Sequence, residues 1–292
     1  MSDTSPTRPP PPPSDAKLAA MVSLLSDPDE HIVESVAAAM EQLDVDVAPL
    51  LEAELAHATG PYDRRLRSVL AQVRHPDADA RLAAHLAGEP ELEQGALLIA
   101  RLVDGGPEPD TVAATLDDLA EQVAAARGRD EDPVRGFDTL SRVLGASDVL
   151  RPLSPDAANP SHALLHGALG TAGGMPLPLC MVWILVARRV GVRLVGSGMP
   201  GHFLLRLPLP DGSSRMHDAF RRGSQVTWRS CRAVLGRYGM APTTPEALDA
   251  DDRAMLLRTL RNVMHLARAV GDRKLHDRAA LIFRGGEQRG LR

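Results

Sequence analysis

Hydrophobic residues are spaced as in amphipathic helices from residue 15 to about residue 129, with short polar breaks between the runs. This spacing is typical of amphipathic helices, and the breaks contain the Asp, Pro and Gly residues that cap and interrupt helices. The pattern predicts a series of mostly short helices. Their expected ranges are 17–25, 32–43, 47–57, 62–74, 79–86, 91–103, 110–127 and 134–144.

The pattern changes between residues 171 and 220, where one long apolar run precedes shorter segments. Pro176 stands where a helix can begin, because Pro is tolerated in the first helical turn. An apolar run to residue 190 follows, and Gly191 stands in the position of a helix-ending glycine. Strands are predicted at 192–196, 202–207 and 214–220, with a turn at 197–201. We therefore expect a buried helix that leads into a small antiparallel sheet.

The last part of the chain is again helix-patterned, with helices predicted at 230–238, 251–270 and 273–283. The last two are expected to form an antiparallel pair that covers the open face of the sheet. The expected fold class is α+β, with a mostly helical N-terminal part, a helix packed on a small antiparallel sheet and a C-terminal helix pair. The spacing of the first helices is similar to that of HEAT-type helix pairs. The predicted parts are a disordered Pro-rich tail at 1–14, a HEAT-like helical region at 15–130, a core at 131–243 and a helical hairpin packed on the core at 244–292.

Composition excludes several function classes. Aromatic residues make up 3% of the chain, so its core must consist mainly of Leu, Val and Ala, which favours packed helices. The formal net charge of −5 and the lack of a basic cluster argue against nucleic-acid binding. Arginine is more frequent in the C-terminal half. This enrichment indicates either a surface that binds an acidic partner or an ordinary solvated surface. The arginines concerned are Arg188, Arg189, Arg221, Arg222, Arg229 and Arg232.

The chain has two cysteines, Cys180 and Cys231, and no Cys-x-x-Cys spacing. Two are too few for a disulfide framework or a structural zinc site, and they fit a reducing cytosol. His162 and His166 have the i, i+4 spacing of a helical zinc site but lack a third ligand, which favours a helix surface. The N-terminus lacks the apolar core of a signal peptide, and no apolar run is long enough to span a membrane. We expect a cytoplasmic protein with no metal, no cofactor and no membrane contact.

Several short motifs between residues 159 and 262 point to a family. They are Asn159 and Ser161, Gly174-Met175-Pro176, the helix end at 186–191, the strand at 200–206, Asp218-Ala219-Phe220, and 258–262 on a closing helix. The stretch resembles the SirB branch of the transglutaminase-like superfamily, and the likeness covers roughly residues 90–270. The resemblance implies a papain-like core in which a helix packs on an antiparallel sheet.

In transglutaminase-like enzymes a Cys opens the central helix, a His opens a strand, and an Asp on the next strand orients the His. A helix N-terminus and a nearby imidazole lower the thiol pKa, and backbone donors hold the oxyanion. By this resemblance His202 and Asp218 take the places of the His and Asp, but Pro176 takes the place of the Cys. Pro supplies no nucleophile and no N–H. The resemblance therefore favours a non-catalytic binding or regulatory module, whose partner, a protein or a small molecule, is unknown.

Cys180 leaves an alternative open. It lies four residues after Pro176, on the same helix face and about one turn (~5–6 Å) deeper. A buried thiol there is an inert small hydrophobe. A reactive thiol would make the protein a hydrolase or acyl-transferase that uses Cys180 with His202 and Asp218. Two further hypotheses are a His202–Asp218 pair that activates water and a helical-repeat scaffold with a vestigial cleft.

Four residues are candidates for lining the cleft: Gly174, Pro176, Gly201 and Arg206. Arg206 follows an apolar strand, where it pairs with either an acidic ligand or a carboxylate at the strand edge. His217 precedes Asp218, so on a strand its side chain points to the opposite face, and we expect it at the surface.

Overall fold

The computed structural model describes residues 14–43, 45–129, 131–150, 152–153, 159–170 and 173–290. The chain divides into two compact units, Met1–Pro76 and Asp77–Arg292. Residues 1–13 of the predicted tail lie outside the described residues. The boundary expected near residue 130 stays a prediction, and the helices just before it pack within the second unit.

The first unit is a group of helices around its own apolar cluster. Its helices are α1 (Asp15–Leu24), α2 (Glu30–Glu41), α3 (Ala48–Leu55) and α4 (Gly60–Arg74). The side chains of Ser14 and Asp29 accept hydrogen bonds from backbone N–H groups at the starts of α1 and α2, as helix N-caps do. The cluster includes the fully buried Leu25, Leu51 and Leu66. Amphipathic spacing therefore gives helices here, and the HEAT-type pairing stays a prediction.

The second unit combines helices with one five-stranded antiparallel sheet, so the α+β class is confirmed. The sheet order is β4-β3-β2-β1-β5. The strands are β1 (Val195–Met199), β2 (His202–Pro208), β3 (Ser214–Asp218), β4 (Ser224–Val226) and β5 (Asp249–Ala250). The α-helices are α5 (Ala78–Ala87), α6 (Leu92–Asp104), α7 (Pro109–Arg127), α8 (Pro133–Ala146), α9 (Leu165–Ala168), α10 (Pro176–Arg189), α11 (Trp228–Arg237), α12 (Asp252–Ala269) and α13 (Arg273–Gly290). Three 3-10 turns are η1 (Pro160–Ala163), η2 (Ala219–Arg221) and η3 (Pro245–Leu248).

Helix α10 is the central element of this unit, and every residue of its stretch from Leu177 to Ala187 is buried. Its ends lie where the sequence predicts them. Gly191 has a φ of +69°, and its N–H and that of Val192 close the helix on the carbonyls of Arg188 and Ala187. This pair of bonds is the Schellman helix end, which a glycine favours because it has no Cβ.

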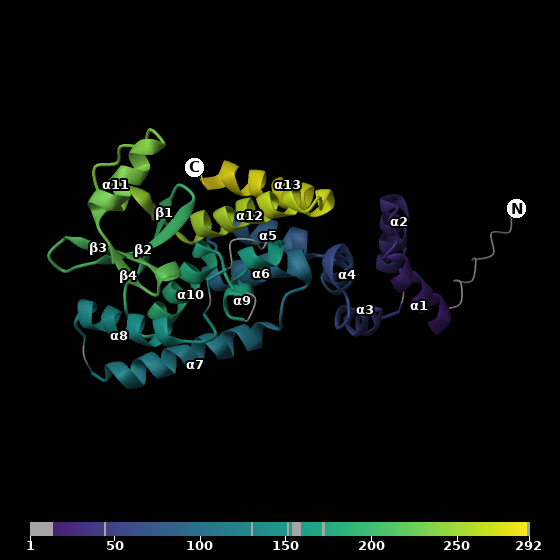
Figure 1. Ribbon diagram of the computed structural model, residues 1–292, viewed down its shortest axis with the longest axis horizontal. Helices are drawn as coiled ribbons and strands as arrows, with labels where there is room; N and C mark the ends of the chain where they lie inside the picture. The colour runs from purple at the N-terminus through teal and green to yellow at the C-terminus, as the bar shows by residue number, and fades with distance from the viewer. Residues whose placement is uncertain are drawn as a thin grey trace, which may run out of the picture. The chain divides into compact units, whose positions relative to one another are not determined.

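The two faces of the sheet bury different side chains. Phe203 and Leu205 of β2 pack in the cluster that contains α10, while Leu204 packs with Cys231 and Leu235 of α11. Figure 1 shows α11 on one side of the sheet and α10 and α8 on the other. The second face is therefore covered by α11 and not by the C-terminal pair. Helices α12 and α13 pack instead on each other and on α6 and α5.

The hairpin of β1 and β2 differs from its prediction. The strand β1 begins at Val195, includes the predicted turn residues 197–199, and pairs Met199 with His202. The turn is therefore only Pro200 and Gly201, which has a φ of +68°. Gly198, predicted in the turn, lies within the strand, where a Cβ would come within 3.1 Å of the Arg258 guanidinium. Close packing thus explains a glycine that resembles a turn residue in the sequence.

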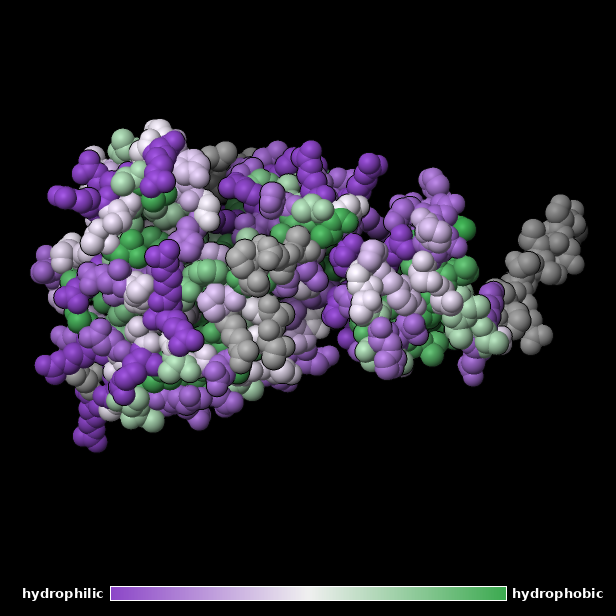
Figure 2. All heavy atoms as spheres, in the orientation of Figure 1, coloured by the Kyte–Doolittle hydropathy of each residue, from purple (hydrophilic) through white to green (hydrophobic). Residues whose placement is uncertain are grey.

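The surface of the second unit is mixed in character. Figure 2 shows hydrophilic side chains interspersed with smaller hydrophobic patches on the face drawn. Within the described residues, no helix is both long and apolar enough to cross a membrane.

Candidate functional site

His202 and Asp218 come together at one end of the sheet. His202 opens β2 and Asp218 closes β3, and because Leu205 pairs with His217 the two residues lie diagonally across the two strands. The His202 Nε2 atom lies 3.0 Å from Asp218 Oδ2. An ionised carboxylate only accepts, so the Nε2–H group of the imidazole is the donor of this hydrogen bond. The predicted pairing of these two residues is thus present in the structure.

The surroundings hold this pair in place. The Asp218 side chain is 5% exposed, and its Oδ1 accepts a hydrogen bond of 3.0 Å from the Phe220 N–H. The His202 ring is 32% exposed and meets the Phe220 ring edge to face, at 6.1 Å between centroids. Arg221 Nε lies 3.7 Å from Asp218 Oδ2 at the surface. The carboxylate is therefore buried and ordered, while the imidazole reaches solvent.

Arg258 of α12 binds the β1–β2 hairpin that carries His202. It donates hydrogen bonds to the backbone carbonyls of Met199, at 2.5 Å, and His202, at 2.9 Å. Its guanidinium also lies over the Phe203 ring, 5.3 Å from the centroid. The sequence did not mark Arg258 as a site residue, although it opens the motif at 258–262. Arg258 thus holds the backbone on both sides of the turn that precedes the His202 side chain.

The N-terminus of α10 is poor in hydrogen-bond donors. Pro176 is the first helical residue, and Pro178 follows in the same turn, so only Leu177 among these three residues carries an N–H. Met175 precedes the helix and makes no side-chain cap bond. A helix N-terminus stabilises an anion through its unpaired N–H groups, and here two of the three are chemically missing.

Cys180 lies inside the core, as the sequence suggests. It is 0% exposed, and its Sγ lies 3.6 Å from the carbonyl oxygen of Phe203. Burial raises the pKa of this thiol, and the nearby negative charge of Asp218 raises it further, against a hydrogen bond from the Ala219 backbone. The thiol is therefore protonated and donates to a backbone carbonyl. Cys231 is also buried, at 1% exposed, because it faces the sheet from α11.

The remaining predicted cleft residues have structural contacts. Gly174 is buried and forms a bridge to Pro152, and a Cβ there would lie 2.7 Å from the Ala168 Cβ. Arg206 is 7% exposed at its side chain and binds Asp249 through two hydrogen bonds, of 2.7 and 2.6 Å, and Glu246 through one of 3.1 Å. Arg206 thus ties β2 to the segment around β5, which is the strand-edge pairing considered from sequence.

The structure also contains a buried acidic group that the sequence did not reveal. Asp104, at the end of α6, accepts hydrogen bonds from Ser161 Oγ at 2.8 Å, from His166 Nε2 at 3.2 Å and from the Gly106 N–H at 3.1 Å. Burial disfavours ionisation of Asp104, but these donors outweigh it and hold its pKa below the usual range. His166 is therefore a partner of a buried carboxylate and not a free surface residue.

His217 is a second correction, because it is buried and not at the surface. It does face away from Asp218, but α8 covers that face, and the Phe137 ring lies 3.9 Å from the imidazole, centroid to centroid. His217 Nδ1 donates to the Gly223 carbonyl at 3.1 Å, while Nε2 is buried without a hydrogen-bond partner among the described residues. Burial lowers the pKa of this imidazole.

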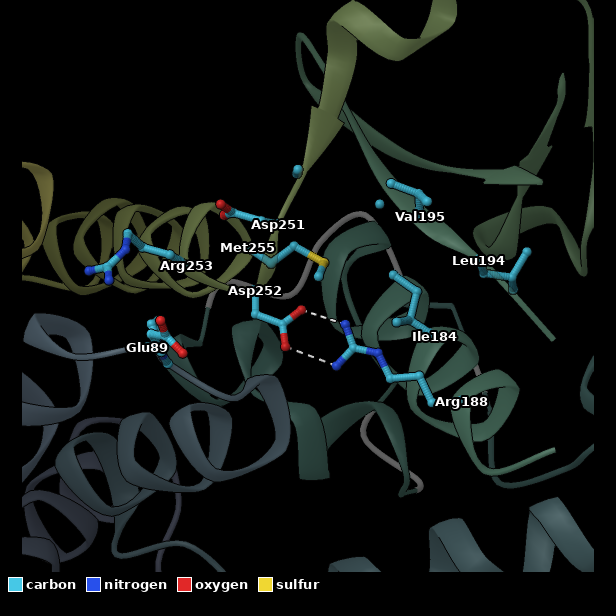
Figure 3. Close-up of a pocket in the computed structure, with 12 residues that line it drawn as sticks. Glu89, Ile184, Arg188, Leu194, Val195, Asp251, Asp252, Arg253 and Met255 are labelled. Carbon is cyan, nitrogen blue, oxygen red and sulfur yellow. Dashed lines mark hydrogen bonds and ion pairs between the residues drawn. The ribbon is translucent and has the colours of Figure 1, made fainter. Parts of the chain in front are cut away.

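A hollow of about 470 Å³ lies at the other end of α10, between that helix, β1 and the start of α12. Figure 3 shows Arg188 and Asp252 facing each other in it, with Ile184 and Met255 directed into the same space. Arg188 binds Asp252 through hydrogen bonds of 2.9 and 2.5 Å, so each charge is already compensated. His202 and Asp218 do not line this hollow.

Metal binding has no support in the part of the chain that the structure describes. No three His, Cys, Asp or Glu side chains there are grouped so as to hold an ion.

Known proteins match the same part of the chain. A family model described as the transglutaminase-like superfamily matches residues 110–261. A UPF0162 protein of Xylella fastidiosa (strain Temecula1) is 38% identical over 128 residues, which are 42% of this chain and 44% of the relative. A UPF0162 protein of Pseudomonas aeruginosa is 29% identical over 194 residues, 63% of this chain and 67% of the relative.

More distant likeness extends to the F-box only protein 21 of Mus musculus, which is 29% identical over 109 residues, 35% of this chain and 17% of that protein. The chain spans less than half the length of the two Xylella relatives, at 44% and 39%. No solved structure matches it significantly. The family match covers more than half of the chain, including α10, the sheet and both members of the His202–Asp218 pair. The chain belongs to the transglutaminase-like superfamily.

Proposed function

We propose that the protein is a non-catalytic binding or regulatory module of this superfamily, within its SirB branch. The observation that carries the proposal is the start of α10, where Pro176 and Pro178 leave the first turn without a thiol and with few N–H donors. A thiol acyl-transferase needs a nucleophile and oxyanion donors at the start of its central helix. By the resemblance, Pro176 takes the place of that nucleophile, and His202 and Asp218, which are in contact, take the places of the His and Asp.

The environment of Cys180 supports the same conclusion. The reactive form of a cysteine is the thiolate, which forms at accessible, electropositive sites. Cys180 has the opposite surroundings: it is fully buried, bonded to a carbonyl, and close to a carboxylate that raises its pKa. The alternative thiol-dependent hydrolase or acyl-transferase would require Cys180 to leave the core before it could react.

A second candidate is a hydrolase in which the His202–Asp218 pair activates water. The 3.0 Å contact and the exposed imidazole favour this candidate, because an oriented neutral histidine is a general base. The scarcity of N–H groups at the start of α10 opposes it, since a developing oxyanion there would lack donors. We therefore favour the binding module.

The proposal includes a location in the reducing cytoplasm. Both cysteines, Cys180 and Cys231, are unpaired and buried. Free thiols of this kind are typical of reducing compartments.

The proposal is tested by the rate at which iodoacetamide alkylates Cys180 in the folded protein. Cys231→Ala removes the other thiol from its apolar site without burying a hydroxyl. We expect Cys180 to react at least about a hundredfold more slowly in the native protein than in denaturant between pH 6 and 9, because labelling must await local opening. Mass spectrometry of the labelled peptide measures both rates.

His202→Ala in the same background is the matched variant. It should leave the native rate unchanged, since His202 does not activate the thiol in this proposal. Rapid labelling below pH 7 that falls sharply in His202→Ala would identify an activated thiol and overturn the proposal.

A further inference from the structure

Basic residues are concentrated in one segment of an otherwise acidic protein. Residues 219–245 contain five arginines and no Asp or Glu, whereas the whole chain has a net charge of −5. The five are Arg221, Arg222, Arg229, Arg232 and Arg237. The segment comprises η2, β4, α11 and the loop after α11, and within it α11 packs on the sheet face away from α10.

Some arginines of this half of the chain form ion pairs within the protein, and others do not. Arg188 pairs with Asp252, and Arg189 pairs with Glu93 and Asp117. Arg229 and Arg232 of α11 form no ion pair with any residue that the structure describes, and both are exposed. Their charges therefore remain available to a partner.

The two arginines line a hollow on the outer side of α11. The hollow measures about 440 Å³, and its other lining residues include Trp228, Met240 and Pro242. Cys231 and Leu235 anchor the opposite side of α11 to the sheet, so this surface is not needed for packing. Figure 2 shows hydrophilic and hydrophobic side chains intermixed over α11, at the upper left.

Large apolar side chains are also exposed beside the hollow. Tyr238 is 64% exposed and Met240 is 43% exposed, at the C-terminal end of α11. Aromatic residues, Met and Arg are the residue types enriched at protein interfaces, where aromatic and Arg side chains carry most of the binding energy. The combination of an apolar hollow and uncompensated guanidinium groups matches a ligand that is both acidic and hydrophobic.

We propose that the outer face of α11 and the following loop bind an acidic protein segment. An aromatic or large aliphatic side chain of that segment occupies the hollow beside Trp228 and Met240, and flanking carboxylates bind Arg229 and Arg232. A nucleic acid fits less well, because the net charge of −5 opposes a polyanion outside this small area. This inference does not depend on whether the His202–Asp218 site is catalytic.

The test is a selection of random 12-residue peptides displayed on phage against the full-length protein. We expect the recovered peptides to combine several Asp or Glu with at least one aromatic or large aliphatic residue. The most enriched peptide is then synthesised with a fluorescent label, and its affinity is measured by anisotropy at two salt concentrations. Because carboxylate–guanidinium contacts carry the binding, the affinity should fall as salt rises.

Variants of the surface locate the binding. The double variant Arg229→Glu/Arg232→Glu should lower the affinity for the peptide at least tenfold. The matched control Arg142→Glu/Arg284→Glu makes the same change in net charge at exposed arginines of α8 and α13, and should change affinity by less than about twofold. Met240→Ala leaves the charge unaltered and should weaken binding at least threefold. Circular dichroism establishes that each variant is folded.

Four results would overturn the proposal. They are recovery of no acidic peptides, an affinity that Arg229→Glu/Arg232→Glu leaves unchanged, an equal loss in the control pair, and tighter Arg229-dependent binding of a 12-residue oligothymidylate. The last result would assign the surface to nucleic acid.

Discussion

At the scale of single residues, two histidines of adjacent strands have opposite environments. His202 is half-exposed and bound to a buried carboxylate, whereas His217 is buried with one nitrogen unsatisfied. The difference follows from what covers each face of the sheet: Phe220 partly covers His202, and Phe137 of α8 stacks on His217. A buried neutral histidine ties stability to pH, because the unfolded chain binds a proton more readily than the folded one.

We predict that His217 makes the protein less stable in mild acid. Burial lowers the pKa of His217 in the folded state. Its contribution to the free energy of unfolding is therefore complete above the ordinary histidine pKa of about 6.5 and is lost as the pH falls below that value. His217→Asn keeps a donor for the Gly223 carbonyl but does not titrate. The free energy of unfolding, measured with urea between pH 5 and 8, should fall more steeply in the parent than in His217→Asn. Parallel curves would contradict the prediction.

At the scale of elements, α10 shows how a helix terminus determines chemistry. Its body is buried and its C-terminal end is closed by Gly191, but its N-terminal turn contains Pro176 and Pro178. Proline suits the start of a helix, because its fixed φ is helical and its missing N–H breaks no helical bond. Proline at these two positions is therefore compatible with the fold, and it leaves the first turn of α10 without a thiol and with fewer N–H donors.

We predict that Pro176→Cys creates a more reactive thiol than Cys180. With both native cysteines changed to Ala, the new thiol lies in the first turn of α10, where the helix dipole favours a thiolate. Its alkylation should show a pKa below the ordinary value of about 8.5. Adding Pro178→Ala restores an N–H and should lower this pKa further, and the rate should fall when His202 is changed to Ala. A thiol that titrates like free cysteine in every variant would show that this helix end does not stabilise an anion.

At the scale of the whole molecule, the apolar clusters of the described residues do not cross between the two units. One cluster is built from residues between Leu18 and Leu70, and the other two lie entirely within residues 82–283. The family match at 110–261 falls within the second unit, as do the His202–Asp218 pair and the α11 surface. Helices α5 and α6 belong to the second unit as well, through contacts with α12 and α13.

We predict that a fragment of residues 77–292 folds without the first unit, because its core does not include residues of that unit. It should be monodisperse and unfold cooperatively on heating, as followed by circular dichroism. The fragment 131–292 is the matched comparison. It lacks α5 to α7, which contribute Leu82, Leu92 and Leu116 to the core, and should lose cooperative unfolding. An unfolded 77–292 fragment would contradict the division at residue 76.

Much of the fold could be predicted where the signals are local. The limits of α10 follow from Pro176 and Gly191, and the amphipathic helices follow from spacing alone. The limits of β1 could not, because Gly198 resembles a turn residue until the Arg258 side chain is seen beside it. The prediction of the α+β class remains correct despite such errors, because it depends on the hydrophobic pattern of the whole chain and not on the limits of one strand.

The candidate site shows the same division. The pairing of His202 with Asp218 could be predicted from a family pattern and from adjacent strands. The Asp104 cluster could not, since Ser161 and His166 lie 57 and 62 residues away along the chain. Nor could the burial of His217 and Cys231, which is decided by α8 and by the face of α11 that meets the sheet.

The sequence by itself determined which chemical groups exist. It specified a proline at the start of the buried helix, a turn with two missing N–H groups, and a segment with five arginines and no acids. Only the tertiary structure decided which of these groups are available. Burial and the nearby charge of Asp218 keep the Cys180 thiol protonated. Carboxylates on other elements pair with Arg188, Arg189 and Arg206. Among the residues that the structure describes, no such carboxylate meets Arg229 or Arg232, which stay exposed. Ionisation and availability depend on neighbours in space, and those neighbours come from distant parts of the chain.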